Sequence, residues 1–239
     1  MGSVQDYSFS GIPELISVRA LLFDFDGTII DSTDAIVKNW QKLGKEMGVD
    51  PNLILATSHG RRSIDVLKLY DPARANWDYV CELEGRIPKE FGSDAIEIPG
   101  ARKLLQELDE LEVPWAVVTS GTRPLLTGWL DVLKLVQPKT LVVAEDVQNG
   151  KPDPACYLLG REKLGMGDAT DIIVIEDAPS GILAGKAAGF KVVGLATTHT
   201  VEQVKEAGAD WIVRDLRSLS AKTYQEGTAK VEIRDALII

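Results

Sequence analysis

Two aspartates, separated by a single residue, end the first apolar segment of the chain. Residues 21–28 read Leu-Leu-Phe-Asp-Phe-Asp-Gly-Thr, so Asp24 and Asp26 follow directly on a predicted strand. Because side chains alternate along an extended chain, both carboxylates lie on one side and their charges repel. Such a pair is costly unless a cation, a shared proton or hydrogen bonds compensate it. The spacing therefore indicates metal or acid–base chemistry at Asp24 and Asp26.

A second acidic pair, Glu176 and Asp177, follows another apolar segment at residues 171–175. In open α/β sheets, ligands bind beyond the carboxyl ends of the strands, where both acidic pairs are expected. Two carboxylate pairs at one sheet edge can share one hard cation, and ligands that are all oxygen favour Mg²⁺. We therefore predict a Mg²⁺ site between the two pairs.

Groups that suit an anionic ligand follow two further segments. Ser120 and Gly121 come after the apolar residues 115–118, and a hydroxyl with a glycine at a strand-to-helix turn suits phosphate binding. Lys151 lies among turn-forming residues at 150–154. Carboxylates, a metal, a hydroxyl and a lysine at one sheet edge are suited to phosphoryl transfer.

The elements that must position these residues are short apolar strands separated by helices. Strands are predicted at residues 18–25, 114–119, 140–143, 171–175, 190–195 and 210–213, and helices at 101–111, 125–133, 154–164, 180–188 and 201–207. Most of the strand segments are continuously apolar, as is typical of strands buried on both faces of a parallel sheet. The alternation predicts an α/β fold with a doubly wound parallel sheet.

The alternation stops between residues 32 and 96, where no strand pattern is found. Helical patterns in this segment cover residues 35–47, 63–69 and 76–91. We predict a small helical cap domain at 32–96, inserted into an α/β core domain formed by residues 1–31 and 97–239. An additional edge strand is predicted near the end of the chain, at residues 230–233.

Composition narrows the classes of function. The 239 residues include 26 lysines and arginines against 36 aspartates and glutamates, which gives a net charge of −10 and argues against binding to nucleic acid or to an anionic membrane. No apolar run reaches the roughly 18 residues of a membrane span, and the first residues are polar, so we expect a cytoplasmic protein. With only two histidines, carboxylates must carry most acid–base chemistry. We expect a monomer whose partner is a small molecule.

Four motifs, in the same order, resemble those of the haloacid dehalogenase superfamily of phosphohydrolases. They are Asp-Phe-Asp-Gly-Thr at 24–28, Val-Val-Thr-Ser at 117–120, Lys-Pro at 151–152 and Glu-Asp at 176–177. Longer segments, among them Ser-His-Gly-Arg-Arg at 58–62 and Leu-Glu-Gly-Arg-Ile-Pro at 83–88, resemble the fungal glycerol-phosphate and 2-deoxyglucose-6-phosphate phosphatases. The resemblance implies a Mg²⁺-dependent phosphatase that acts on a small polyol or sugar phosphate monoester.

The resemblance also implies a role for each core residue. Asp24 would attack phosphorus and form an aspartyl phosphate, and Asp26 would act first as general acid and then as general base. The Mg²⁺ ligands would be Asp24, the backbone carbonyl of Asp26, Asp177 and, directly or through water, Glu176. The phosphate would be bound by Thr28, Ser120, Gly121 and Lys151.

Three cap residues are expected to contact the substrate. Arg62 stands where related enzymes carry an arginine that meets the substrate, and His59 and Glu84 are candidates for binding hydroxyls. Ordinary surface charges at Arg62 and Glu84, and a turn residue at His59, are the alternatives. Arg61 stands where the fungal phosphatases often carry an aromatic residue, a departure that concerns the substrate more than the chemistry. His199 is expected to be structural.

Three rival functions are weighed against the phosphatase. A phosphosugar mutase of the same superfamily would use the same aspartates, but similar mutases often carry a histidine where this chain has Ile36. A dehalogenase would not need Asp26 to protonate an alcohol. A non-catalytic binding module would lack Asp24 or Asp26, and both are present. These residues favour the phosphatase.

Overall fold

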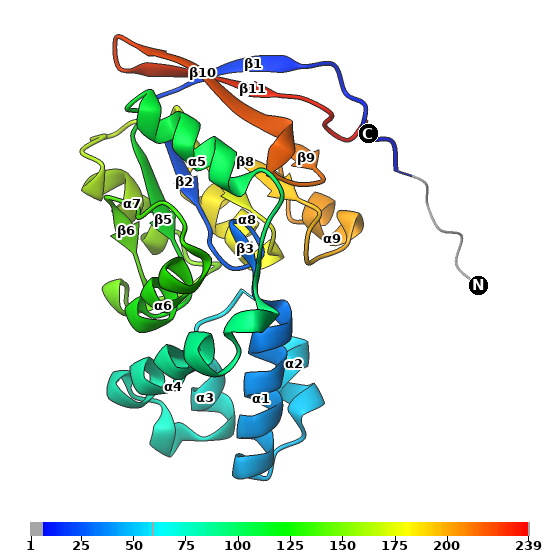
Figure 1. Ribbon diagram of the computed structural model, residues 1–239, viewed down its shortest axis with the longest axis vertical. Helices are drawn as coiled ribbons and strands as arrows, with labels where there is room; N and C mark the ends of the chain where they lie inside the picture. Colours follow the sequence, from blue (N-terminus) through cyan, green and yellow to red (C-terminus); the bar gives the residue numbers. More distant parts are fainter. Residues whose placement is uncertain (1–6, 59, 239) are drawn as a thin grey trace.

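The computed structural model describes residues 7–58 and 60–238, which form an α/β core and a smaller group of helices (Figure 1). In this part of the chain the strands are β1 Glu14–Val18, β2 Ala20–Phe23, β3 Ile30–Asp31, β4 Ile96–Glu97, β5 Trp115–Val118, β6 Leu141–Val142, β7 Ile172–Glu176, β8 Lys191–Leu195, β9 Trp211–Val213, β10 Leu219–Gln225 and β11 Thr228–Ile233. The α-helices are α1 Thr33–Met47, α2 Pro51–Ser58, α3 Ser63–Tyr70, α4 Trp77–Glu90, α5 Ala101–Glu110, α6 Arg123–Leu133, α7 Ala155–Lys163, α8 Pro179–Ala187 and α9 Val201–Glu206. Short 3₁₀ helices are η1 Pro72–Arg74, η2 Gly92–Asp94, η3 Ala144–Asp146 and η4 Leu216–Ser218.

The main sheet is parallel, with the strand order β6-β5-β2-β7-β8-β9. Leu21 and Phe23 of β2 belong to a buried cluster that includes side chains of α5 and α6. Leu22, which points the other way, packs with side chains of α7 and α8. The sheet is therefore covered on both faces, and the predicted α/β fold with a doubly wound parallel sheet is confirmed.

The strand register brings the sequence motifs to one edge of the sheet. β2 lies between β5 and β7, and Phe23 is level with Val117 of β5 and with Ile175 of β7. The residues that follow these three strands therefore emerge side by side at the carboxyl ends of the strands. That edge faces the group of helices α1–α4 (Figure 1).

Both ends of the chain differ from the predicted pattern. The strand predicted at residues 18–25 is present as β2, but it begins only after a bend at Arg19, and Val18 ends the preceding strand β1, which belongs to a different sheet. The strand predicted at residues 230–233 is present within β11, but it lies at the centre of a separate antiparallel sheet, β1-β11-β10, and not at an edge. Its partner β10 carries mostly polar residues after Ala221, so no apolar run marks it.

Helices α1–α4 form a compact group with its own apolar core. Trp40 and Leu43 of α1 pack with Ile54 of α2, Leu67 of α3 and Val80 of α4. The three predicted helices are present, and α2 is an additional helix that the sequence pattern did not indicate. Its apolar residues do not share one face, because Leu53 is exposed while Ile54 is buried.

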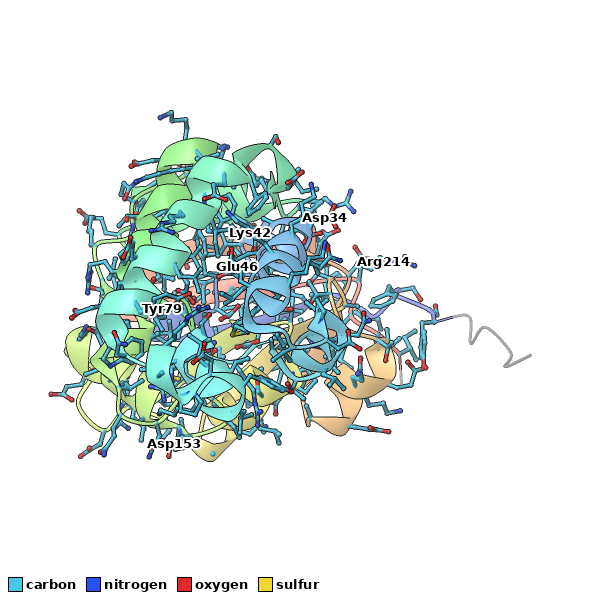
Figure 2. All side chains as sticks on the ribbon, turned by 90° about the horizontal axis from the view of Figure 1, so that it is seen from below. Asp34, Lys42, Glu46, Tyr79, Asp153 and Arg214 are labelled. Carbon is cyan, nitrogen blue, oxygen red and sulfur yellow. The ribbon has the colours of Figure 1, made fainter. Side chains whose placement is uncertain are left out.

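The helical group is joined to the core by two short strands that pair with each other. In this pair, Ile30 of β3 lies opposite Glu97 of β4, and Asp31 lies opposite Ile96. Seen from below, helices α1–α4, which are called the cap from here on, lie in front of the sheet (Figure 2). We propose that the boundary between core and cap runs through this pair, at residues 32 and 96. Within the described residues, no helix combines the length and the apolar character needed to cross a membrane.

Candidate active site

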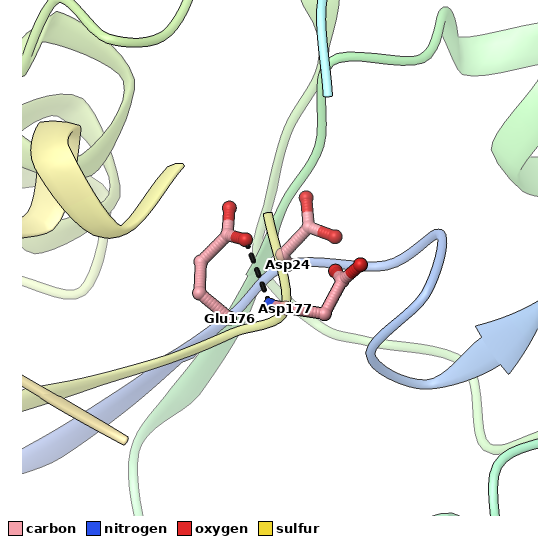
Figure 3. Close-up of side chains that lie close together, drawn as sticks. All are labelled: Asp24, Glu176 and Asp177. Carbon is pink, nitrogen blue, oxygen red and sulfur yellow. Dashed lines mark hydrogen bonds between the residues drawn. The ribbon is translucent and has the colours of Figure 1, made fainter. Parts of the chain in front are cut away.

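Three carboxylates meet where β2 and β7 end. Asp24 follows β2, and Glu176 and Asp177 come from the end of β7 (Figure 3). One oxygen from each lies within 4.8 Å of the others, and all three residues are buried. Burial raises the pKa of Asp24 well above its ordinary value, although the charge of Lys151 acts in the opposite direction. Ionised carboxylates at this distance require a compensating cation.

Lys151 supplies one positive charge at the centre of the cluster. Its Nζ donates to Asp24 Oδ1 at 2.5 Å, to Glu176 Oε1 at 2.7 Å and to the carbonyl oxygen of Val118 at 3.1 Å. Burial lowers its pKa, but Asp24 and Glu176 outweigh that effect and hold the pKa above its ordinary value. One ammonium against three carboxylates leaves a surplus of negative charge, and a divalent cation fits that surplus.

Glu176 is saturated with hydrogen bonds from the protein. Besides Lys151, it accepts from the Tyr157 hydroxyl at 2.9 Å and from the backbone amides of Asp177 and Ala178, each at 2.9 Å. Burial and the Glu176 charge raise the pKa of Tyr157 well above its ordinary value, so the phenol stays a donor. Glu176 is thus placed to fix Lys151 and the turn that carries Asp177. Tyr157 was not predicted, because its helix gives no local sign of a polar contact.

Asp177 is held from several sides. It accepts from Thr28 Oγ1 at 3.1 Å and from the hydroxyl of Thr198, and Nδ1 of His199 lies 3.6 Å from its Oδ2. A Cβ at Gly27, where φ is +91°, would collide with the Asp177 carboxylate. Thr28 was expected at the phosphate, but its side chain is fully buried against Asp177. The structure therefore places Thr28 behind a prospective metal ligand.

Asp26 faces a cavity of about 90 Å³ between sheet edge and cap. Its Oδ1 accepts from Ser32 Oγ at 2.6 Å. Burial raises the pKa of Asp26 to about 6, and the Ser32 hydrogen bond acts in the opposite direction. A carboxyl that titrates close to neutral pH can both donate and accept a proton. Ser32 was not among the predicted site residues.

Ser120 and Gly121 line the same cavity. The Ser120 hydroxyl donates to the carbonyl oxygen of Gly60 at 3.0 Å, and Ser180 donates to the same oxygen at 3.3 Å. The Gly121 amide donates to Thr119 Oγ1 at 2.9 Å. A hydroxyl expected at the phosphate is therefore in contact with a loop of the cap. Of the other expected residues that line the cavity, the core provides Asp24, Asp26 and Asp177, and the cap provides Glu84.

The two cap charges behave differently from ordinary surface residues. Glu84 is buried, and it accepts from Ser63 Oγ at 2.5 Å and from the backbone amide of Thr122 at 2.7 Å, so it joins cap helix α4 to the start of α6. Burial raises the pKa of Glu84 to about 7, against the lowering by these two donors. The surface-charge alternative does not describe a side chain in this position.

Arg62 is also buried, but its guanidinium faces the core loop and not the cavity. It donates to the carbonyl oxygens of Val147 at 2.8 Å and of Gln148 at 3.1 Å, and it pairs with Asp65 at 2.7 Å. It thereby ties the cap to the loop that leads to Lys151. The exposed Arg61, and not Arg62, lines the cavity. The third predicted cap residue, His59, lies outside the described residues.

The raised pKa of Glu84 predicts a pH-dependent stability. A carboxyl whose pKa rises from 4.5 to about 7 on folding binds more protons in the folded state, so stability falls as pH increases from about 4.5 to 7. The pKa difference corresponds to ~3 kcal/mol. We expect the stability of Glu84→Gln to lack this fall between pH 4.5 and 7, because an amide does not titrate. Thermal melting of both proteins between pH 4 and 8 measures it, and parallel curves would contradict it.

Comparisons with known proteins agree with this geometry. Residues 21–195 match the model of the haloacid dehalogenase-like hydrolases. The chain is 42% identical to glycerol-1-phosphate phosphohydrolase 1 and 37% identical to 2-deoxyglucose-6-phosphate phosphatase 2, both from Saccharomyces cerevisiae. The first match covers 92% of each chain, and the second covers 92% of this chain and 97% of the relative.

Solved structures with the same fold include proteins named as a hydrolase and as a mutase. A hydrolase from Pseudomonas syringae matches with a TM-score of 0.71 and 26% identity, over 82% of this chain and 94% of that one. A putative beta-phosphoglucomutase from Thermotoga maritima matches with a TM-score of 0.60 and 25% identity, over 83% and 95%. The resemblance inferred from four sequence motifs is confirmed, and the chain belongs to the haloacid dehalogenase-like hydrolase family.

Proposed function

We propose that the protein hydrolyses the phosphate monoester of a small polyol or sugar through an aspartyl-phosphate intermediate. One observation carries this proposal: Asp24, held by Lys151, faces the same cavity as Asp26, whose pKa burial raises to about 6. A nucleophilic carboxylate beside a carboxyl that titrates near neutral pH provides both halves of ester cleavage.

The first step transfers the phosphoryl group to the protein. A carboxylate oxygen of Asp24 attacks phosphorus, the bond from phosphorus to the alcohol oxygen breaks, and Asp26 gives its proton to the leaving alcohol. Lys151 Nζ, 2.5 Å from Asp24 Oδ1, offsets the repulsion between the anionic nucleophile and the anionic phosphate. Ser120 provides a hydroxyl for a phosphate oxygen once it leaves Gly60.

The second step returns Asp24 to its free form. Asp26, now ionised, takes a proton from a water molecule that attacks phosphorus, and the bond between phosphorus and Asp24 breaks. The side-chain hydrogen bond from Ser32 fixes the orientation of the Asp26 carboxyl in both steps. Closure by the cap keeps other water molecules away from the aspartyl phosphate.

We propose that Mg²⁺ is held by Asp24, Asp177 and the backbone carbonyl of Asp26, with Glu176 outside the direct ligand set. The four donors that already occupy Glu176 support this division. A bound divalent cation would neutralise charge on the phosphate and on Asp24. The hydrogen bonds from Thr28 and Thr198 would keep Asp177 in position for it.

Removal of the metal is expected to abolish activity. Chelation should stop phosphate release, and Mg²⁺ should restore it, because the surplus negative charge of the carboxylate cluster otherwise repels the substrate. Ca²⁺ should not restore it, since its longer bonds and higher coordination number would misplace Asp24. Phosphate release is measured after exhaustive chelation and after each metal is added. Full activity without a divalent metal would refute the assignment.

The comparisons support a phosphatase more strongly than a mutase. The yeast relatives are named for glycerol 1-phosphate and 2-deoxyglucose 6-phosphate, and they align over nearly the whole chain. At the position where similar mutases often carry a histidine, this chain places the apolar Ile36 on the cavity wall. An aliphatic side chain cannot move a proton to or from a sugar hydroxyl, so it favours release to water.

A phosphate-release screen with Mg²⁺ tests the function and orders the substrates. It compares glycerol phosphates, hexose 6-phosphates, 2-deoxyhexose 6-phosphates, hexitol phosphates and phosphoglycolate. We expect release from polyol or sugar phosphates without a bisphosphate activator. Conversion of one sugar phosphate into its isomer, with no inorganic phosphate formed, would establish the mutase instead.

We also propose that the enzyme works as a monomer in the cytoplasm. Residues of a single chain, from the sheet edge and from helices α1–α4, line the candidate cavity. Cys81 and Cys156 are both free thiols, which fits a reducing compartment. Sedimentation of the purified protein tests the first point, and cell fractionation tests the second.

A further inference from the structure

Cap helix α1 presents a buried amide to the active-site cavity. Ile36, Asn39 and Trp40 line the cavity from this helix, and their spacing of three and four residues places them on one face. Asn39 is only 7% exposed, yet its side chain has no hydrogen-bond partner among the described residues. An amide in a cavity wall that no protein group bonds needs water or a ligand to complete its hydrogen bonds, and a hydroxyl of a ligand can take the place of that water.

Two other polar side chains of the cap wall already have partners. Ser63 donates to Glu84, and Glu84 also accepts from the Thr122 amide. The buried polar atoms that are sealed from solvent without a partner belong to other residues of the described chain. The Asn39 amide is therefore both unpaired and reachable.

We propose that Asn39 is a specificity-determining residue whose amide binds a hydroxyl of the substrate's leaving group; this inference rests on the proposed phosphatase function. Asn39 reaches the cavity from the cap, while Asp24, Asp26 and Ser120 reach it from the sheet edge. The phosphate belongs at the sheet edge, so the alcohol part of the ester extends towards Asn39. A primary amide donates and accepts, which matches a neutral hydroxyl that also does both.

The apolar neighbours of Asn39 suit the same ligand. Ile36 and Trp40 provide surfaces for the carbon atoms of a polyol or a sugar, on both sides of the amide along the helix. A site built to bond a hydroxyl discriminates strongly against an analogue without it, because the amide is then left unpaired again. Asn39 thus distinguishes a hydroxylated ester from a plain alkyl ester.

The Asn39 amide could instead serve a second, smaller cavity. It measures about 60 Å³, and Asn39 also lines it, together with Lys42 and Glu46 of α1 and Tyr79 of α4, which Figure 2 labels. Its outer wall is charged and includes the ion pair between Lys42 and Glu90 at 2.8 Å. If Asn39 served this cavity alone, its replacement would leave the choice of substrate unchanged.

The test compares two esters that differ only in their hydroxyls: glycerol 3-phosphate and 1-propyl phosphate. In Asn39→Leu, which keeps the volume and removes the amide, we expect kcat/KM for glycerol 3-phosphate to fall about 10- to 100-fold. For 1-propyl phosphate it should stay within about twofold. The matched control is Gln41→Leu, which removes an exposed amide from the same helix and should change neither value. Asn39→Ala replaces the leucine variant if thermal melting shows that the latter does not fold.

Each outcome decides the proposal. A selective loss on glycerol 3-phosphate supports it. Equal losses on both esters would assign Asn39 a structural role, and unchanged values on both would assign its amide to the second cavity; either result overturns the proposal. The wild-type protein tests the proposed function separately. If that function were wrong, the wild type would release phosphate from neither ester and from no sugar phosphate.

Discussion

Replacement of Asp24 by asparagine is expected to abolish turnover of every phosphate ester. The amide cannot form the aspartyl phosphate, and the two carboxylates clustered with Asp24 are already engaged: Glu176 is saturated with donors, and Asp177 is held by Thr28 and Thr198. The loss of activity in Asp24→Asn should not be accompanied by a loss of stability. Because burial and the neighbouring carboxylates raise the pKa of Asp24, removal of its charge relieves repulsion in the metal-free protein.

Two measurements made together test this assignment. Phosphate release by Asp24→Asn should lie at the background of the assay, while its melting temperature in chelator should equal or exceed that of the wild type. The control is Asp34→Asn, the same substitution at an exposed position of α1, which should retain full activity. If Asp24→Asn kept more than a trace of the wild-type rate, with contamination excluded, the nucleophile would be a different residue.

The core of the site could be predicted because its residues belong to short segments with strong local patterns. Asp24, Ser120 and Glu176 each follow a continuously apolar strand, and parallel strands bring such residues to one sheet edge. The order of the strands is not written in any single segment. It is fixed by long-range packing, which places β2 between β5 and β7 and so brings Lys151 onto Asp24.

The cap contacts could not be predicted, because they depend on how helices α1–α4 pack against the sheet edge. Adjacent arginines, Arg61 and Arg62, look equivalent in the sequence, yet one lines the cavity and the other bonds to the carbonyls near Val147. Glu84 lies two residues from the exposed Glu82 and Arg86 of its own helix, and it is buried where α6 packs against α4. An asparagine such as Asn39, with no motif around it, gives no signal until the cavity is seen.

Replacement of Asp26 by asparagine should have the second-largest effect, and this effect should depend on the leaving group. General acid–base catalysis typically contributes about 10²- to 10⁴-fold, so the rate on glycerol 3-phosphate should fall by that factor. The rate on p-nitrophenyl phosphate should fall less in the first step, because nitrophenolate leaves without a proton. The backbone carbonyl of residue 26 is unchanged, so the Mg²⁺ requirement should persist.

The pH dependence separates this role from a structural one. Since burial raises the pKa of Asp26 to about 6, its acid form is lost as pH rises above 6, and the kcat/KM of the wild type for glycerol 3-phosphate should fall there. Asp26→Asn should lack this decline. Ser32→Ala should move it to higher pH, because the Ser32 hydrogen bond lowers that pKa. Rates measured from pH 5 to 8 on all three proteins decide the matter: the same decline in wild type and Asp26→Asn would assign the titrating proton to another group and leave the cavity without its general acid.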